Sequence, residues 1–459
     1  MDAKFRRWGL WPAPMASARE IQNPPMHRGK TPAWAGTEHW QASWSNYMDL
    51  GPTSGTIAGE RSTVLLNRFH QPALPYGPAQ ATILDRESVQ AARRVMSAWP
   101  GHAATPLIAR PALAGAVGIA ELWCKDESRR FGLGSFKALG GAYAVYRCLS
   151  DAVEAQTGTL PATGDLLAGR YRALASETTV TSATDGNHGR SVAWGAQLFG
   201  CRCVIYMHKG VTAARVRAIE GLGASVERVD GTYDDSVRVC AEDAARLGRQ
   251  VISDTAYRGY TEVPCQVMQG YGLIAEEIME ERPADWRPTH VFMQVGCGGF
   301  AAAVYGRLWE AWGAPRPRLV LVEPTAADCL NRSCVAGELT VTPGSLDTLI
   351  GGLACGEVSL VAWPILKPSA FACMTIEDAW AVEAMRRLAQ DGEDPPIVAG
   401  EAGASGVAGL MAAAARPETR HLLGLDAGSR VLTVISEGAT DPQLYRDLVG
   451  LAPAEVLAG

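Results

Sequence analysis

One lysine stands in a turn that would make it a nucleophile. Residues 130–141 place Lys137 among small and apolar residues. Gly132 and Gly134 permit a tight turn with positive φ, and Ser135 is a suitable N-cap for a following helix. Lys137 then lies near the positive end of the helix dipole, where an apolar surrounding also disfavours the ammonium form. We expect a lysine held partly neutral, able to attack an aldehyde carbon; the alternative is an ordinary surface lysine at a helix start.

Two glycine-bearing stretches follow this turn along the chain. Residues 182–189 read Ser-Ala-Thr-Asp-Gly-Asn-His-Gly, and residues 294–299 read Gln-Val-Gly-Cys-Gly-Gly directly after an apolar, strand-like run. Glycines between a strand and a helix expose backbone N–H groups that can bind a phosphate. One such loop is a weak signal, but a lysine turn followed by these two stretches is a much stronger one.

Together the three stretches resemble the fold-type II enzymes that use pyridoxal 5′-phosphate (PLP), in the superfamily of the tryptophan synthase β subunit and the serine and threonine dehydratases. They are most similar to the diaminopropionate ammonia-lyases, and the resemblance runs from about Ala73 to the C-terminus. It implies an α/β fold of two domains, each with a mainly parallel, twisted sheet flanked by helices.

The resemblance also implies how PLP is held. Lys137 bonds to its aldehyde, Asn187 donates to its 3′-oxygen, and Ser436 faces its ring nitrogen. The phosphate lies on backbone N–H groups of Gly296, Cys297, Gly298 and Gly299. A hydroxyl at the ring nitrogen, unlike a carboxylate, does not stabilise a protonated ring. The weaker electron sink favours β-elimination over transamination.

Two aspartates match catalytic positions of the family. Dehydratases of this fold carry a small residue where this chain has Asp185, whereas the ammonia-lyases carry aspartate. A carboxylate there can accept an α-proton and attract a cationic β-amino group. Asp254 matches the second family aspartate, so Lys137, Asp185 and Asp254 are the predicted catalytic residues. Taken alone, Asp185 also suits a turn before glycine, and Asp254 suits a helix N-cap. His188 could be a base, but the interpretation we prefer is a role in loop geometry.

The predicted reaction is the α,β-elimination of 2,3-diaminopropionate, or of a close 2,3-diamino acid, to pyruvate and ammonia. One alternative is a dehydratase or β-replacement synthase acting on a hydroxylated or activated amino acid, and Asp185 argues against the simple serine dehydratase. Another is a non-catalytic ligand-sensing protein on the same fold. The presence of Lys137 and Asn187 argues against a sensor. The sequence leaves the preferred stereoisomer open.

The amino-acid composition limits the kinds of partner that the protein can bind. The chain has 459 residues, 47% hydrophobic and 20% charged, with a net charge of −6. This balance, without a long Lys/Arg run, argues against a nucleic-acid surface. No apolar run is long enough for a membrane span, and no long apolar segment follows the charged N-terminus as in a secretory signal. We predict a cytoplasmic enzyme that binds a small amino acid, with no metal; a homodimer is expected from the family.

The eleven cysteines form no even framework. Cys201 and Cys203 flank one residue, but no second pair completes a metal site. Cytoplasmic thiols are expected to be reduced. Cys329 and Cys355 match a family pair that can approach or bridge near the site entrance, and the sequence leaves their redox state open.

The order of elements predicts three regions. Residues 1–72, with Trp34, Trp40 and Trp44, form an irregular N-terminal arm. Residues 73–149 and 262–459 form the large PLP-binding domain, and residues 150–261, where strands alternate with helices, form the small domain. The cofactor should lie in the cleft between the two domains, at the carboxyl ends of the strands.

Apolar runs place the elements within these regions. Strands are predicted at 121–127, 178–181, 203–207, 225–229, 251–253, 291–295, 318–323 and 430–435. Helices are predicted at 88–99, 141–153, 189–199, 213–222, 233–247, 264–281, 299–313, 376–389 and 403–415. The charged residues at the end of the first strand, Lys125, Asp126 and Glu127, are expected to be solvated.

Overall fold

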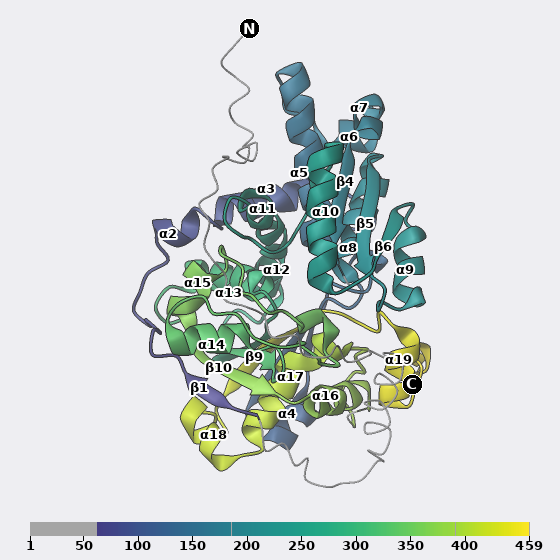
Figure 1. Cartoon of the computed structure of the whole chain (residues 1–459). Coiled ribbons are helices and arrows are strands. Elements are labelled where there is room, and N and C mark those ends of the chain that lie inside the picture. Colours follow the sequence, from purple (N-terminus) through teal and green to yellow (C-terminus); the bar gives the residue numbers. More distant parts are fainter. Residues whose placement is uncertain (1–61, 185, 391, 459) are drawn as a thin grey trace, which may run out of the picture. The chain divides into compact units, whose positions relative to one another are not determined.

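The computed structural model describes residues 62–184, 186–390 and 392–458, which belong to one compact unit (Figure 1). Trp34, Trp40 and Trp44 of the predicted arm lie outside the described residues, and so does Asp185.

A seven-stranded sheet forms the larger part of this unit. Its strands are β1 (Val64–Leu66), β2 (Leu107–Ala109), β3 (Glu121–Asp126), β8 (His290–Gln294), β9 (Arg318–Pro324), β10 (Ala370–Ile376) and β11 (Arg430–Ile435). Their order in the sheet is β1-β10-β9-β8-β11-β3-β2. The five inner strands are parallel, and β1 and β2 are antiparallel to their neighbours at the two edges. Every residue of β8 is buried, as expected where helices cover both faces of a parallel sheet.

A second sheet has four strands and is wholly parallel. Its strands are β4 (Thr179–Ala183), β5 (Arg202–His208), β6 (Ser225–Val229) and β7 (Gln250–Val251). They lie in the order β6-β5-β4-β7. Each strand is joined to the next through a helix, the connection that parallel strands require.

Helices surround both sheets. Before the second sheet come α2 (Pro78–Ala81), α3 (Arg86–Met96), α4 (Pro111–Val117), η2 (Arg130–Gly132), α5 (Ala138–Thr157), α6 (Thr163–Leu167) and α7 (Arg172–Glu177). Within and after it come α8 (Asn187–Phe199), α9 (Ala213–Glu220), α10 (Tyr233–Leu247), α11 (Glu262–Tyr271) and α12 (Leu273–Glu281). The remainder are α13 (Gly299–Trp312), α14 (Cys329–Ala336), η3 (Gly351–Leu353), α15 (Trp363–Ser369), α16 (Asp378–Gln390), α17 (Glu401–Ala414), α18 (Pro417–Leu423), α19 (Pro442–Val449) and α20 (Pro453–Ala458).

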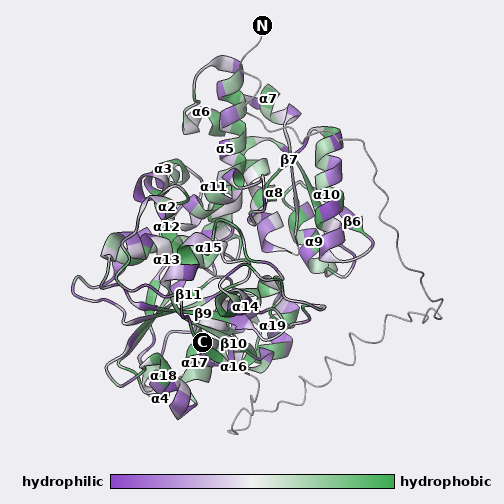
Figure 2. Cartoon of the chain, turned by 60° about the vertical axis from the view of Figure 1, so that its left-hand side comes forward, coloured by the Kyte–Doolittle hydropathy of each residue, from purple (hydrophilic) through white to green (hydrophobic). Residues whose placement is uncertain are grey.

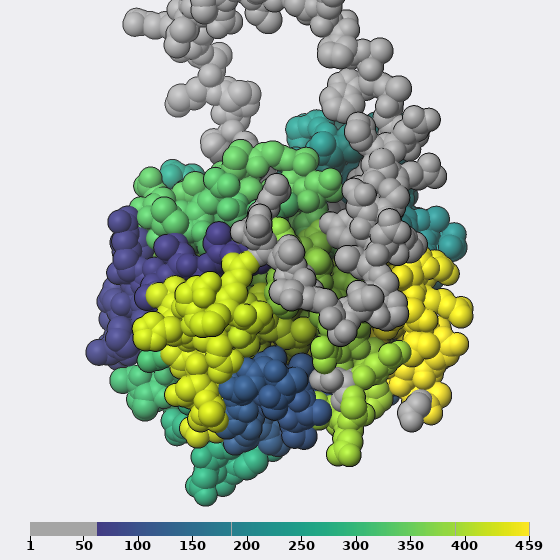
Figure 3. Space-filling model, turned by 90° about the horizontal axis from the view of Figure 1, so that it is seen from below, coloured from purple at the N-terminus to yellow at the C-terminus, as the bar shows by residue number. Residues whose placement is uncertain are grey.

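Residue pattern explains where each helix lies. Helix α10 buries Ser236, Cys240 and Ala244, one face at a spacing of four, and Figure 2 shows alternating hydrophobic and hydrophilic bands along it. Helix α17 is apolar around nearly its whole circumference and packs between the large sheet and α16. Helix α18 lies beside α4, where Arg420 donates to the carbonyl of Gly118 at 2.8 Å (Figure 3).

The predicted α/β class with parallel sheets is confirmed. Strands β6 and β11 and helix α10 have the predicted bounds. Three strands were not predicted: β1, which lies inside the range expected to be an irregular arm, and β2 and β10. The strands of the second sheet fall within residues 150–261, but the domain boundaries at 150 and 262 stay predictions.

Candidate active site

A cavity of about 550 Å³ lies where the carboxyl ends of strands from both sheets meet. It is lined by predicted site residues from every motif: Lys137, Asn187, Asp254, Gly296, Cys297, Gly298, Gly299 and Ser436. Asp185 lies outside the described residues. Loops at this edge of parallel sheets are where ligands of α/β proteins bind.

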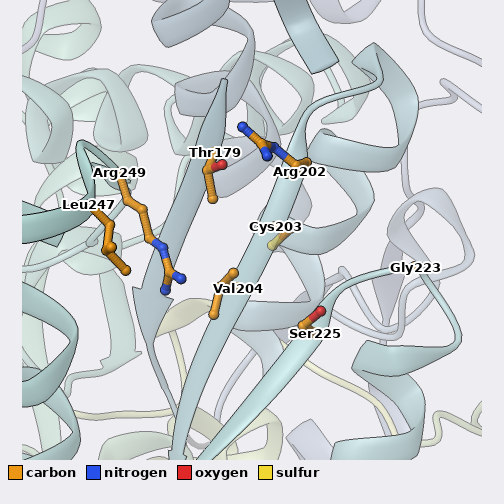
Figure 4. Close-up of a pocket in the computed structure, with 8 residues that line it drawn as sticks. All are labelled: Thr179, Arg202, Cys203, Val204, Gly223, Ser225, Leu247 and Arg249. Carbon is orange, nitrogen blue, oxygen red and sulfur yellow. The ribbon is translucent and has the colours of Figure 1, made fainter. Parts of the chain in front are cut away.

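A second cavity, of about 370 Å³, lies at the opposite ends of the strands of the small sheet. It is lined by Thr179, Arg202, Cys203, Val204, Gly223, Ser225, Leu247 and Arg249 (Figure 4). None of the predicted site residues lines it. The larger cavity is therefore the candidate active site.

The lysine turn is held against the segment that follows β11. Gly132 and Gly134 have φ values of 70° and 77°, as predicted. The amide of Phe136 donates to the carbonyl of Ser436 at 3.0 Å, and the backbone of Ser135 bridges to that of Glu437. Ser135 is not the N-cap as expected, because Lys137 itself occupies that position in front of α5.

The lysine is not held neutral, so this part of the prediction is wrong. Lys137 Nζ lies 2.5 Å from Asp254 Oδ2. Burial lowers the pKa of Lys137, but the charge and hydrogen bond of Asp254, together with the influence of Tyr271 and Cys297, raise it well above its usual value. The ion pair also shifts the pKa of Asp254. Burial raises this pKa, but the charge of Lys137 holds it below its ordinary range. The sequence could not place this partner, which lies 117 residues away along the chain.

A histidine stands behind this ion pair. His188 Nδ1 lies 3.7 Å from Asp254 Oδ2, while its Nε2 is 2.9 Å from the carbonyl oxygen of Ile252. Burial lowers the pKa of His188. The side chain therefore faces the predicted catalytic aspartate as well as supporting the loop.

Asn187 begins helix α8, and its side chain crosses to the other sheet. Its Nδ2 donates to Glu437 Oε2 in a short hydrogen bond. The amide of Ala402 donates to the other carboxylate oxygen of Glu437 at 3.2 Å. An amide nitrogen has two hydrogens, so Asn187 retains one for a further acceptor in the cavity.

The glycine loop joins β8 to α13 as predicted. Gly298 is the N-cap of α13 and has a φ of 96°. A Cβ at this position would lie 3.0 Å from Leu366 Cδ1 and 3.1 Å from Ala362 Cβ. A Cβ at Gly296 would lie 2.9 Å from Cys355 Sγ. The loop thus presents its backbone at the start of a 14-residue helix, where an anion is stabilised.

Ser436 is buried at the end of β11. Gln294 Nε2 donates to Ser436 Oγ at 2.8 Å and to the carbonyl of Val434 at 2.8 Å. Because Oγ already accepts this hydrogen bond, its own hydrogen remains available to an acceptor.

The charged strand end next to the turn is buried, which corrects the expectation of solvated charges. Lys125 Nζ lies 2.9 Å from Glu277 Oε2, and Arg130 joins Glu127 and Glu277, each at 2.7 Å. Asp126 is buried as well. These ion pairs tie the turn to α12, because buried charges are retained when they are paired.

All eleven cysteines are free thiols, including Cys329 and Cys355. Burial raises the pKa of the Cys329 thiol, and a hydrogen bond from Cys355 together with other contacts lowers that of Cys297 to about 7.

Among the described residues, no group of three or more His, Cys, Asp or Glu side chains is arranged to hold a metal ion. Nor does any helix in the described ranges have the length and hydrophobicity to cross a membrane.

Comparison with known proteins decides the family. The family model described as pyridoxal-phosphate dependent enzyme matches residues 98–437. The diaminopropionate ammonia-lyase of Escherichia coli (strain K12) is 38% identical over 372 residues, which cover 80% of this chain and 92% of the relative. The chain belongs to the diaminopropionate ammonia-lyase family of pyridoxal-phosphate dependent enzymes.

Solved structures of this family share the fold. The holo form of diaminopropionate ammonia lyase from Escherichia coli aligns with a TM-score of 0.77 and 36% identity, covering 84% of this chain and 96% of that one. The same enzyme in complex with an aminoacrylate-PLP azomethine reaction intermediate aligns with a TM-score of 0.76 and 36% identity.

The cavity of this family member fits its cofactor. PLP requires a lysine, a phosphate site and polar partners for its ring. Lys137, the backbone at the start of α13 and the hydroxyl of Ser436 line one cavity, and a Cβ at position 296 or 298 would lie within 3.1 Å of a neighbouring side chain.

Three polar residues of the site were not predicted from the sequence. Glu437 orients Asn187, Gln294 orients Ser436, and Arg215 of α9 lies 3.4 Å from Glu401 of α17. Their positions in the sequence could have indicated two of them. Glu437 directly follows Ser436, and Gln294 is the polar residue at the carboxyl end of the buried strand β8.

Proposed function

We propose that the chain catalyses the PLP-dependent α,β-elimination of 2,3-diaminopropionate to pyruvate and ammonia. The observation that carries this proposal is the ion pair of Lys137 and Asp254 in the same cavity as the glycine loop and Ser436. Support for the substrate comes from the similarity to the diaminopropionate ammonia-lyase of Escherichia coli.

We assign the cofactor contacts to this chain's own residues. Lys137 bonds to the aldehyde carbon, and the backbone of Gly296, Cys297, Gly298 and Gly299 donates to the phosphate. Asn187 donates its second amide hydrogen to the 3′-oxygen. Bound PLP supplies the electron sink that acidifies the α-hydrogen of an attached amino acid.

Ser436 sets how strong that sink is. Since Gln294 donates to Ser436 Oγ, the hydroxyl hydrogen is left to donate to the ring nitrogen of PLP, which would keep that nitrogen unprotonated. A neutral ring stabilises a carbanion less than a protonated one, which suits prompt loss of the β-amino group and disfavours transamination.

The proton transfers are assigned by position. Lys137, when its nitrogen is free, would accept the α-proton of the L-isomer; in the structure Asp254 Oδ2 lies 2.5 Å from that nitrogen. Asp185 is assigned to the opposite face, where it would accept the α-proton of the D-isomer and attract the β-ammonium group.

Two measurements on the purified protein test the proposal. A visible absorbance band that is lost on borohydride reduction reports PLP bonded to a lysine. Pyruvate formation is then measured with 2,3-diaminopropionate, other 2,3-diamino acids and serine. Highest kcat/KM for 2,3-diaminopropionate is expected, whereas a preference for serine would favour the rival dehydratase function.

We also propose a homodimer in the cytoplasm. This rests on the family resemblance and on the eleven thiols, which are free in the structure as expected for a reducing compartment. Light scattering at several protein concentrations measures the oligomeric state, and a monomer throughout would contradict the proposal.

A further inference from the structure

The ring of His188 has one nitrogen with a fixed role and one without a partner. Nε2 is 2.9 Å from the carbonyl oxygen of Ile252. A carbonyl only accepts hydrogen bonds, so Nε2 carries the hydrogen. Nδ1 is buried and makes no hydrogen bond to the described residues. A buried polar atom without a partner requires an explanation.

That nitrogen faces Asp254. In the neutral ring Nδ1 is an acceptor, and it lies 3.7 Å from Asp254 Oδ2, so two acceptors are close together. The contact is tolerated because Lys137 Nζ donates to the same oxygen at 2.5 Å. A proton on Nδ1 would turn the contact into a charge-assisted hydrogen bond.

The proposed function removes this support from Asp254. A lysine nitrogen bonded to PLP carries at most one hydrogen in place of three, and the 3′-oxygen of the cofactor competes for that one, so Asp254 loses the ammonium donor that it has in the structure. A buried carboxylate that has lost its donor tends to take up a proton, and a protonated Asp254 cannot accept another one. The nearest described side chain that can supply a charge is His188.

We propose that His188 is a positioning residue for the elimination: its Nδ1 takes up a proton when Lys137 is bonded to PLP and thereby keeps Asp254 ionised. The step is a plain protonation by solvent or by the departing lysine proton, with no electron transfer. In this way one proton is shared among Lys137, Asp254 and His188, and its place depends on whether the lysine is free.

No other described ionisable group around Lys137, Asp254 and His188 can supply Asp254 with a positive charge. The further described ionisable side chains that interact with Lys137 or Asp254 are Tyr271 of α11, Tyr260, Cys297 and Cys355, and the Cys355 thiol brings no positive charge. Burial raises the pKa of both tyrosines, which keeps them neutral near pH 7. The Cys297 thiol is an acid and brings no positive charge.

Nitrogen-15 NMR of histidine side chains tests the proposal without any substrate. The chain has eight histidines, and His188 is assigned by the signal that disappears in His188→Gln, or in His188→Asn should the first variant fold poorly. We expect a neutral ring with hydrogen on Nε2 in the cofactor-free protein and a doubly protonated ring after PLP is bound. A neutral His188 ring in both forms would overturn the proposal.

Two substitutions distinguish the proton on His188 Nδ1 from the hydrogen bond by which Nε2 supports the loop. Gln at 188 keeps a donor for the Ile252 carbonyl and loses Nδ1, whereas Asn places an amide donor where Nδ1 stood. We expect His188→Gln to lower kcat by up to about 10²-fold and to move the acid limb of the kcat/KM profile to higher pH. His188→Asn should retain the wild-type position of that limb.

A purely structural role predicts the reverse order of the two variants, and finding it would contradict the proposal. The matched control is His290→Gln. His290 is also buried, with Nε2 3.0 Å from the Leu423 carbonyl, but its Nδ1 contacts Thr289 at 2.8 Å. This variant should leave the acid limb unchanged.

The inference rests on the role proposed for Lys137. The NMR result is independent of pyruvate formation, so the inference and the proposed function can each fail alone.

Discussion

At the scale of single residues, the site depends on one lysine whose properties come from distant partners. Lys137 could be found from its glycine–serine turn, because glycines, serine and helix formers are local signals. Its charge could not, because Asp254 reaches it only through the tertiary fold. The same distinction separates Ser436, found by its motif, from Gln294, which orients it.

Replacement of the lysine is the first prediction. Lys137→Ala should lose the borohydride-sensitive absorbance band and nearly all turnover, because no other described lysine lines the cavity. Absorbance spectra and pyruvate assays measure both. Elimination at the wild-type rate would assign the nucleophile elsewhere.

Gly298 provides a prediction about the phosphate. Gly298→Val should weaken PLP binding, because its φ of 96° is unfavourable for valine and its Cβ would lie 3.0 Å from Leu366. PLP affinity is measured by fluorescence titration. The control is Gly450→Val, with a φ of 90° and no atom within 4 Å of an added Cβ. Equal affinity in the two variants would place the phosphate elsewhere.

Asp185 provides a prediction about stereochemistry. Asp185→Asn should reduce elimination from the D-isomer by about 10² to 10⁴-fold, the range for a positioned acid–base group, and reduce that from the L-isomer less. The measurement is kcat/KM for both isomers of 2,3-diaminopropionate. Equal small losses on the two isomers would contradict a base on the opposite face.

At the scale of elements, helices and parallel strands were predictable where apolar periodicity was long. Strand β11 and helix α10 follow from their residue patterns alone. Strands β1 and β2 are three residues long, too short for a periodic signal, and β10 begins directly after a proline-containing helix. The burial of Lys125 was missed because its partner Glu277 belongs to a helix far along the chain.

Glu437, after β11, and Glu401 of α17 form a buried acidic pair, and their partners Asn187 and Arg215 come from the small-sheet part of the chain. Burial and the charge of nearby Glu401 raise the pKa of Glu437 from its ordinary 4.5 to about 7. A carboxyl whose pKa is higher in the folded protein contributes stability below pH 4.5, and this contribution is lost as the pH rises through about 7.

The melting temperature of the cofactor-free protein should therefore fall as the pH is raised across this window. Glu437→Gln should make the dependence shallower, since the titrating group is gone. The exposed Glu418→Gln should leave the slope as in the wild type. An identical slope in Glu437→Gln would assign the pH dependence to other groups.

At the scale of the whole molecule, the two sheets supply different parts of one cavity. The large sheet contributes the glycine loop and Ser436, and the small sheet contributes Asn187, with Asp254 following its last strand. Resemblance to the family indicated this arrangement, but only the fold shows the cross-sheet contacts of Asn187 with Glu437 and of Arg215 with Glu401.

The most direct measurement of the central claim is the ratio of ammonia to pyruvate formed from 2,3-diaminopropionate by the PLP-loaded protein. Loss of the β-amino group followed by hydrolysis of the remaining enamine releases two molecules of ammonia for each pyruvate, whereas serine can give only one. The account predicts this two-to-one ratio, with higher kcat/KM for 2,3-diaminopropionate than for serine. Absence of pyruvate from both isomers of 2,3-diaminopropionate would contradict it.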